Sequence, residues 1–507
     1  MEFLRKINPV LYFILFLIIL FFFFGFNDVI TSRPGSIHAW RQADCASMAL
    51  NYYQDGMDFF NPELMQQNAD GNTSGHNISE FPVVYYIVAA LYHVFGYHEI
   101  IFRLLNLLIF FIGLVFLYKI LLRFLGNIFW AVSVTLLFYS SAILVYYSPG
   151  FLPDTTALAL VFPGWYYFFV FMETGKKKTL VISFLFFTMA SLLKITAALS
   201  PLAITALLII DYLGIFKTEK RKNIFNNKAA IILALGVFFV VNAIWLAWVF
   251  YYNNLHNTDY FGTRIWPVWK LTSGEFSEVV KAIRLRWLGE FMNREVQLIY
   301  LVLGVFIIWT FNRTNTILLL TMVFLVMGSV AFVVMFFEVL GVHDYYLINL
   351  TIFPLFILLT GFESFKRNYP RFYNSVYVKI AFSILILFAL INTKSKHSER
   401  IAGWWEPYAK YENLNNLSGY LDSVGLKKTD KIVVIPDCTP SLSLYLVNRK
   451  GWTMMKFHPA KDVLKYKKLG AEYLIINGPE YVHTNDFDSI PKVKIGEKEG
   501  VFVYKLQ

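Results

Sequence analysis

The stretch PVLYFILFLIILFFFFGF, residues 9–26, carries no charge and is long enough to cross the hydrocarbon of a bilayer as a helix. It follows Arg5 and Lys6, and no small-residue cleavage site follows it, so we expect an uncleaved membrane anchor. Further apolar stretches that reach or approach this length lie at residues 100–118, 127–146, 154–172, 179–193, 197–214, 230–252, 297–311, 316–337, 346–363 and 376–392. The pattern predicts a polytopic α-helical membrane protein with about eleven transmembrane helices.

The composition of the whole chain agrees with this prediction. Of 507 residues, 57% are hydrophobic, 19% aromatic and only 16% charged, which is too apolar for water-soluble domains of this length. Two cysteines exclude a disulfide scaffold and any Cys-rich zinc or iron–sulfur site. Cys45 and Cys438 are both expected outside the membrane, where they could pair, although two free thiols are the favoured expectation.

The basic residues in short loops predict the orientation of the chain. With a cytoplasmic N-terminus, the inner segments hold 16 basic residues, and Lys194 is the one basic residue of the short outer loops. The net charge of +11 is then explained by attraction to the anionic cytoplasmic leaflet, and no nucleic-acid partner is expected. The same orientation places the C-terminal region outside.

The composition changes near Asn392, because the last 115 residues hold 18 basic and 13 acidic side chains. We therefore expect a transmembrane catalytic domain at residues 1–392 and a small α/β domain at 393–507. In the latter, KIVVIPD (431–437) and AEYLIIN (471–477) predict buried strands, helices are expected between them, and residues 492–506 predict a hairpin. The domain lacks the glycine-rich motifs of nucleotide sites.

The turn PDCTP (436–440) follows the first of these strands, at the strand end where α/β proteins often bind ligands. An ordinary strand-to-helix turn, with Thr439 or Ser441 as the helix cap, is the favoured interpretation. The string Trp404-Trp405-Glu406 has a superficial likeness to the WWD motif of oligosaccharyltransferases, but an interfacial aromatic pair explains it better.

Two outer loops of the predicted transmembrane domain are long, at residues 28–99 and 253–296. The first carries eight acidic residues against two arginines, and a loop of this length rarely serves only as a connection. It is expected to contain two helices, at residues 38–54 and 81–95, that lie at the membrane interface. Residues 275–292 place their apolar side chains on one stripe, which predicts a third interfacial helix.

Ionisable and aromatic side chains gather where predicted spans meet the outer face. These candidates are His38, Trp40, Arg41, Asp44, Glu80, Asp154, Lys194, His343, Asp344, Tyr345 and Tyr346. An ionisable group at membrane depth costs roughly 2.5 to 3.5 kcal/mol on insertion scales, so Asp154 and Lys194 in particular invite a functional interpretation. For any single residue the alternative is a side chain that reaches to water or caps a helix; their location on one face favours function.

Four of these segments together resemble a known superfamily. IHAWRQADCASMALNYYQDGMDFFNPEL (37–64), SEFPVVYYIVAALYHVFG (79–96), PDTTALAL (153–160) and HDYYLINLTIFPLFIL (343–358) resemble, in that order, the lipid-sugar-dependent glycosyltransferases that include protein O-mannosyltransferases and bacterial aminoarabinose transferases. The resemblance covers about residues 1–392. It implies a GT-C fold in a bacterial inner membrane, with the C-terminal domain periplasmic, and transfer of a sugar from a polyprenyl-phosphate donor to a glycan, lipid or protein acceptor.

The resemblance also implies that an Asp of the first outer loop is the catalytic base. Asp44 lies about one helical turn later than the usual position, which Arg41 approaches, and Phe81 replaces a usual Lys. The chemistry requires a carboxylate that removes the acceptor's hydroxyl proton and cations that stabilise the departing phosphate. We therefore expect Asp44 as base. Arg41, Lys194 and His343 are candidate phosphate ligands, and Glu80 and Asp154 would orient sugar hydroxyls or support the base.

No cofactor is required by the sequence. Asp44, Glu80, Asp154, His343 and Asp344 include hard oxygen ligands that suit magnesium or manganese, as some members of this superfamily use, but no spacing is diagnostic. The alternative function is a transporter or flippase of lipid-linked sugars, for which internal repeats and mid-membrane polar groups would be expected. A purely structural membrane protein is a third interpretation, which leaves the acidic first loop unexplained.

Overall fold

The computed structural model describes residues 9–71, 73–215, 224–262, 264–403, 408–437, 439–454, 459–482 and 485–507. The chain divides into two compact units. One contains Met1–Val29, Leu104–Trp245 and Arg264–Ser398, and is called the membrane unit here because it holds most of the apolar helices. The other contains Ile30–Arg103, Leu246–Thr263 and Glu399–Gln507, and is called the loop–tail unit.

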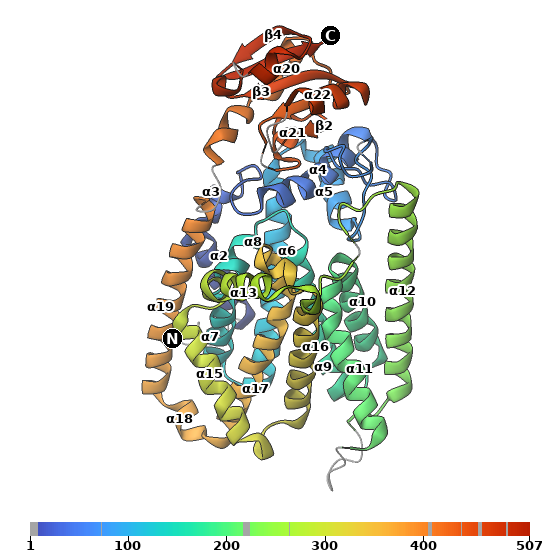
Figure 1. Ribbon diagram of the computed structural model, residues 1–507. Helices are drawn as coiled ribbons and strands as arrows, with labels where there is room; N and C mark the ends of the chain where they lie inside the picture. Colours follow the sequence, from blue (N-terminus) through green and yellow to red (C-terminus); the bar gives the residue numbers. More distant parts are fainter. Residues whose placement is uncertain are drawn as a thin grey trace. The chain divides into compact units, whose positions relative to one another are not determined.

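Helices make up the membrane unit (Figure 1). Its longer elements are α2 (Pro9–Phe23), α6 (Glu99–Leu125), α7 (Ile128–Tyr139), α8 (Ala142–Tyr147), α9 (Asp154–Thr174), α10 (Lys177–Leu193), α11 (Leu199–Leu213), α12 (Lys228–Leu255), α15 (Arg294–Trp309), α16 (Thr316–Met335), α17 (Ile352–Asn368) and α19 (Val376–Ile401). The short α3 (Phe26–Val29) and α18 (Pro370–Asn374) join them. Residues of α6, α12 and α19 belong to both units.

All eleven predicted spans contain a helix. Within the described residues, seven helical segments are long and apolar enough to cross a bilayer, or eight if the pair Ser273–Phe291 and Arg294–Trp309, bent by 92°, is one span. The shorter helices α2, α7 and α10 account for the difference from the predicted count. The prediction of a polytopic helical membrane protein is confirmed.

The predicted span 127–146 is not one helix. It breaks between α7 and α8, where the Ser140 hydroxyl donates to the Leu137 carbonyl and the Ser141 side chain caps α8 by accepting from the Leu144 amide. Serine side chains compete for the backbone in this way, so two adjacent serines end one helix and begin the next. Hydropathy alone did not distinguish this break from a continuous span.

The three predicted interfacial helices are present. In the loop–tail unit they are α4 (Ala39–Asp55) and α5 (Val83–Phe95). In the membrane unit, residues 275–292 form α13 (Ser273–Ala282), a π-helical turn (Ile283–Trp287) and α14 (Leu288–Phe291). Trp287 is fully buried and its indole nitrogen donates to the Leu340 carbonyl at 2.9 Å. The apolar stripe is therefore partly covered by protein.

A five-stranded mixed sheet forms the core of the C-terminal part. Its strands are β1 (Lys431–Ile435), β2 (Gly451–Thr453), β3 (Ala471–Asn477), β4 (Lys492–Lys498) and β5 (Val501–Leu506), in the order β2-β1-β3-β5-β4. β2, β1 and β3 are parallel, and β4 and β5 form the predicted antiparallel hairpin. Helices α20 (Leu417–Ser423), α21 (Leu442–Val447), α22 (Pro459–Lys468) and α23 (Asn485–Asp488) complete it. The predicted α/β character is confirmed, although β2 was not predicted.

The first outer loop and the C-terminal part form one compact unit, which cuts across the predicted boundary at residue 392. The Gly451 amide of β2 donates to the Met65 carbonyl at 3.0 Å, and the Gln67 amide donates to the Gly451 carbonyl at 2.7 Å. Lys450 pairs with Asp55 at 2.9 Å and also with Glu63. A segment of the loop therefore covers the β2 edge, which would otherwise offer unpaired backbone groups. The division into a catalytic domain and a separate α/β domain stays a prediction.

The helices α6 and α9 pack without space for a side chain at Gly113. A Cβ there would lie 2.8 Å from the Cα of Ala159, whereas a Cβ at Gly236 of α12 would meet nothing within 4 Å. We expect Gly113→Ala to destabilise the purified protein by about 1 to 3 kcal/mol through overpacking. Gly236→Ala is the matched control and should be neutral or stabilise by up to ~1 kcal/mol. Thermal melting in detergent tests this, and equal melting temperatures would contradict the close packing.

Candidate functional site

The start of α4 is held in a defined conformation by its preceding loop. Ser36 and His38 both adopt left-handed backbone angles, with φ of 61° and 56°, which non-glycine residues adopt at an energetic cost. The Gln42 side chain donates to the carbonyls of Gly35 at 2.9 Å and Ile37 at 3.0 Å. These bonds tie the loop to the first turn of α4, the turn that carries Trp40 and Arg41.

Arg41 and Glu80 form a buried ion pair within the loop–tail unit. Their side chains are only 4% and 7% exposed, and the Ser79 hydroxyl donates to the second Glu80 oxygen at 2.8 Å. The Arg41 guanidinium also lies over the ring of Phe261, 4.3 Å from its centroid. A charge that is removed from water must be paired in this way. The pair connects α4 to the residue just before α5.

Asp44 lies one helical turn after Arg41 and is fully buried. The Tyr260 hydroxyl donates to Asp44 Oδ2 at 2.9 Å. Oδ1 has no hydrogen-bond partner in the part of the chain that the structure describes. Burial raises the pKa of this carboxyl to about 7, although Arg41 and Tyr260 act in the opposite direction. One oxygen is therefore held in place and the other can accept a proton near neutral pH.

Cys45, the next residue, has no such role. It is buried, the Tyr85 hydroxyl donates to its sulfur at 3.3 Å, and burial raises the pKa of its thiol to about 12. The side chain therefore stays protonated and unreactive. Cys45 is a free thiol. Its proposed partner Cys438 lies outside the described residues, as do Trp404, Trp405 and Glu406.

A second polar cluster lies in the membrane unit and is centred on Lys194. The Lys194 ammonium is 3.1 Å from Asp154 Oδ1, and the Asp154 side chain is fully buried. Asp154 begins α9, and Lys194 has an extended backbone between α10 and the 3₁₀ turn Ile195–Ala198. The ammonium also lies 5.6 and 5.2 Å from the ring centres of Tyr345 and Tyr346. Aromatic faces attract a cation, so four predicted residues meet here.

His343 and Asp344 join this cluster. The Tyr147 hydroxyl donates to Asp344 Oδ1 at 2.7 Å, and the His343 ring stacks on that of Tyr346 with 5.9 Å between centroids. Asn349, in the same 3₁₀ segment Asp344–Thr351, donates to the Asp154 carbonyl at 3.2 Å. All six candidate residues of the membrane unit are thus linked by contacts within that unit.

The five candidates of the loop–tail unit are also close in that unit, from His38 and Trp40 to Glu80. Sequence reasoning missed three of their neighbours: Tyr260 and Phe261 from the second long outer loop, and Ser441, whose hydroxyl donates to the Trp40 carbonyl at 3.2 Å. The aromatic pair at 260–261 in an outer loop was a usable signal. Ser441 was considered only as a helix cap.

The donor set does not fit a divalent cation in this arrangement. The carboxylate of Glu80 is occupied by Arg41, and a buried cation beside a candidate metal ligand disfavours a second positive charge. Among the described residues, no group of three or more His, Cys, Asp and Glu side chains could hold a metal ion. Mg or Mn as a cofactor stays a hypothesis, and no step below depends on it.

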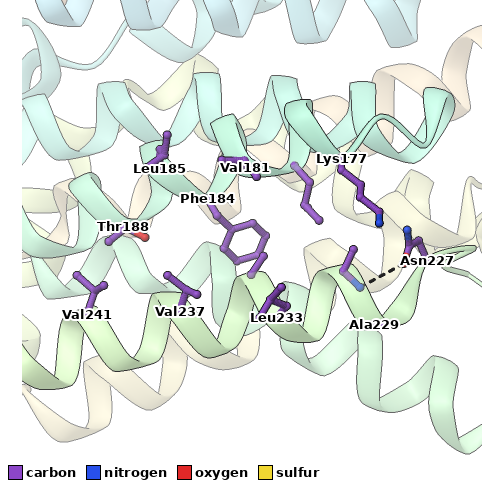
Figure 2. Close-up of a pocket in the computed structure, with 13 residues that line it drawn as sticks. Lys177, Val181, Phe184, Leu185, Thr188, Asn227, Ala229, Leu233, Val237 and Val241 are labelled. Atoms are coloured by element: carbon purple, nitrogen blue, oxygen red, sulfur yellow. Dashed lines mark hydrogen bonds between the residues drawn. The ribbon is translucent and has the colours of Figure 1, made fainter.

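An apolar pocket of the membrane unit is lined by none of the candidate site residues. It has a volume of about 630 Å³ and lies between α10 and α12 (Figure 2). Figure 2 shows Phe184, Leu233 and Val237 along the groove and Lys177 and Asn227 at one end. None of the described residues that line it is acidic. Most of the side chains of α12 are exposed in the structure, so bilayer hydrocarbon is the natural filling.

The buried pair Lys194–Asp154 should contribute to the stability of the protein. We expect Lys194→Met to destabilise the membrane unit by about 3 to 5 kcal/mol, because it leaves the fully buried Asp154 carboxylate without its cation. The double variant Lys194→Met/Asp154→Asn should recover much of this loss. Lys178→Met, at an exposed lysine, is the control and should melt like the wild type. A double variant no more stable than Lys194→Met would refute the pairing.

Comparisons with known proteins agree with this architecture. Residues 79–248 match the family model described as dolichyl-phosphate-mannose-protein mannosyltransferase. No curated protein matches the chain significantly by sequence. Three solved structures share its fold at low identity. ArnT from Cupriavidus metallidurans in the apo state has a TM-score of 0.61 at 11% identity and covers 97% of both chains.

ArnT from the same organism bound to undecaprenyl phosphate has a TM-score of 0.58 at 13% identity, over 98% of this chain and 97% of that chain. The Archaeoglobus fulgidus oligosaccharyltransferase has a TM-score of 0.52 at 11% identity, over 88% of this chain and 65% of that chain. None of these comparisons supports the transporter alternative. The chain is therefore a multi-pass membrane protein that shares the GT-C fold of these structures, and its residues 79–248 are similar to a family of mannosyltransferases.

Proposed function

We propose that the chain transfers a sugar from a polyprenyl-phosphate donor to a hydroxyl group of an acceptor glycan, lipid or protein, with Asp44 as the general base. The acceptor oxygen forms a bond to the anomeric carbon of the sugar, and the bond from that carbon to the phosphate oxygen breaks. The hydroxyl proton goes to Asp44 and the polyprenyl phosphate leaves. The similarity to an ArnT that binds undecaprenyl phosphate supports a lipid-phosphate donor of this class.

The observation that carries the assignment is the asymmetry of the Asp44 carboxylate. Tyr260 holds Oδ2, while Oδ1 is buried and has no hydrogen-bond partner within the described residues. A general base needs a fixed orientation, an oxygen that can receive a proton, and a pKa near the working pH. Asp44 meets all three conditions, since burial raises its pKa to about 7.

The departing phosphate needs cations, and Arg41, Lys194 and His343 are the candidates for this role. Lys194 has the flexible stem and the three donors that suit a phosphate. Its ammonium lies 3.1 Å from Asp154 Oδ1 and near the rings of Tyr345 and Tyr346. Arg41 is engaged by Glu80, so its contribution is a positive potential beside Asp44, which lowers the pKa of that carboxyl.

The C-terminal part is proposed to guide the acceptor. Within the loop–tail unit a groove of about 790 Å³ has one wall from residues 31–36 of the first loop and another from the C-terminal part, including Tyr411, Glu412 and Asn415. Its mixed polar and apolar lining suits a hydroxyl-rich acceptor. The donor lipid stays in the bilayer, whereas a glycan or protein acceptor would approach through water-exposed parts such as these.

Replacing the base tests the proposal directly. We expect Asp44→Asn to lower turnover by about 10² to 10⁴, because the amide cannot take the proton, while binding of the lipid donor is retained. Radiolabelled polyprenyl-phosphate sugars and the purified protein provide the assay. Asp58→Asn removes an exposed carboxylate of the same loop and should keep normal turnover. Near-normal turnover of Asp44→Asn would move the base to Glu80 or Asp154.

The pKa of Asp44 predicts the pH dependence of catalysis. The carboxyl works as a base only when it is deprotonated, and its pKa is raised to about 7. The rate constant kcat/KM should therefore fall about tenfold per pH unit below pH 7. Glu80→Gln removes a negative charge that raises this pKa, so the acid limb should move to lower pH. An acid limb of kcat/KM near pH 4, or one that Glu80→Gln moves to higher pH, would contradict the role of Asp44 as the base.

We propose a cytoplasmic N-terminus and a periplasmic C-terminal part in a bacterial inner membrane, motivated by the 16 basic residues of the predicted inner segments. In a variant without the native cysteines, Ser423→Cys should react with an impermeant thiol reagent in intact spheroplasts. Thr174→Cys, at an exposed position on the predicted inner side, should react only after permeabilisation. The reverse pattern would overturn the orientation.

A further inference from the structure

Ser441 occupies the N-cap position of α21, yet its side chain does not cap that helix. The turn is secured by its neighbours instead. The Leu442 amide donates to Thr439 Oγ1 at 2.9 Å, and the Ser443 amide donates to Asp437 Oδ2 at 2.9 Å. Serine at this position normally accepts from the first turn. Its hydroxyl is therefore left for another partner.

That hydroxyl is directed at α4. α21 packs against α4 in the loop–tail unit (Figure 1), and Ser441 is fully buried. Its Oγ donates to the Trp40 carbonyl at 3.2 Å. Trp40 precedes Asp44 by one helical turn on α4, and the Ser441 side chain acts to lower the pKa of the Asp44 carboxyl. A serine carries a single hydroxyl proton, so it serves one of these two acceptors at a time.

We propose that Ser441 is a positioning residue of Asp44, through which the C-terminal part takes a direct part in catalysis. Rotation about the Cβ–Oγ bond turns the Ser441 hydroxyl proton from the Trp40 carbonyl to the ionised Asp44 carboxylate. This hydrogen bond keeps the carboxylate in its orientation until the acceptor's proton is transferred. Tyr260 and Ser441 then hold the carboxylate from two segments that lie far apart in the sequence. This inference rests on the proposed role of Asp44 and adds a residue from beyond position 392.

The test separates catalysis from substrate binding. In the full-length protein, Ser441→Ala should lower kcat about tenfold to a hundredfold, as expected for a lost hydrogen bond to a charged group, with KM for donor and acceptor changed less than twofold. Ser441→Cys has a weak donor of similar size and should lose kcat as Ser441→Ala does. Ser441→Thr keeps a hydroxyl and should keep kcat within about threefold of the wild type. Ser423→Ala, at an exposed serine of the same region, is the matched control.

Two outcomes would overturn the inference: an unchanged kcat in Ser441→Ala, or a raised acceptor KM with kcat unchanged, which would make Ser441 part of the acceptor site. Addition of Ser441→Ala to Asp44→Asn should cause no further loss of kcat. The contact is tested separately by melting temperatures of the two single variants and the double variant, which should be non-additive. If Asp44→Asn remains active, the proposed base is wrong, whereas additive melting effects refute the Ser441 contact itself.

Discussion

The ion pair between Arg41 and Glu80 is the interaction on which the outer-loop site depends. Both side chains are nearly removed from water, and either charge alone would be costly there. The pair joins the first turn of α4 to the segment that leads into α5. Asp44 follows one turn later on α4, so the same pair sets its position and, through the Arg41 charge, limits how far burial raises its pKa. Tyr260 and Phe261 then complete the surroundings from a third segment.

The membrane unit must also pair a buried charge, and it does so between two helix ends. Asp154 is fully buried at the start of α9, and Lys194 reaches it from a break between two helices. Helix ends are the places where a membrane protein can hold charged groups, because the chain there approaches water and has unpaired backbone groups. The rings of Tyr345 and Tyr346 lie 5.6 and 5.2 Å from the ammonium, and the His343 ring stacks on that of Tyr346.

The C-terminal part is less independent than its composition suggests. It shares backbone hydrogen bonds, ion pairs and a groove with the first outer loop. A polar domain that covers a sheet edge with a loop from elsewhere gains stability and also fixes that loop. In this chain the covering loop also carries Asp44, the candidate base. The C-terminal part therefore helps to fix the segment on which that candidate lies.

The sequence by itself determined the class of protein, the helices that cross or line the membrane, the α/β tail and most of the polar candidates. Hydropathy and period-two strand patterns are local properties of the chain, so they predict helices and strands directly. Asp44 and Arg41 could be placed on one side of a helix in advance because they are three positions apart, although the ion-pair partner of Arg41 is Glu80. The break at Ser140 and Ser141 was missed because hydropathy averages over it.

Only the tertiary structure decided which partners those residues meet. Tyr260 and Ser441 lie 216 and 397 positions from Asp44 in the chain, and no spacing rule links them to it. The ion pairs Lys194–Asp154 and Arg41–Glu80 depend in the same way on which segments pack together. The physical reason is that a buried polar group is satisfied by whichever segment folding brings within hydrogen-bond distance, and that choice is made by the whole fold.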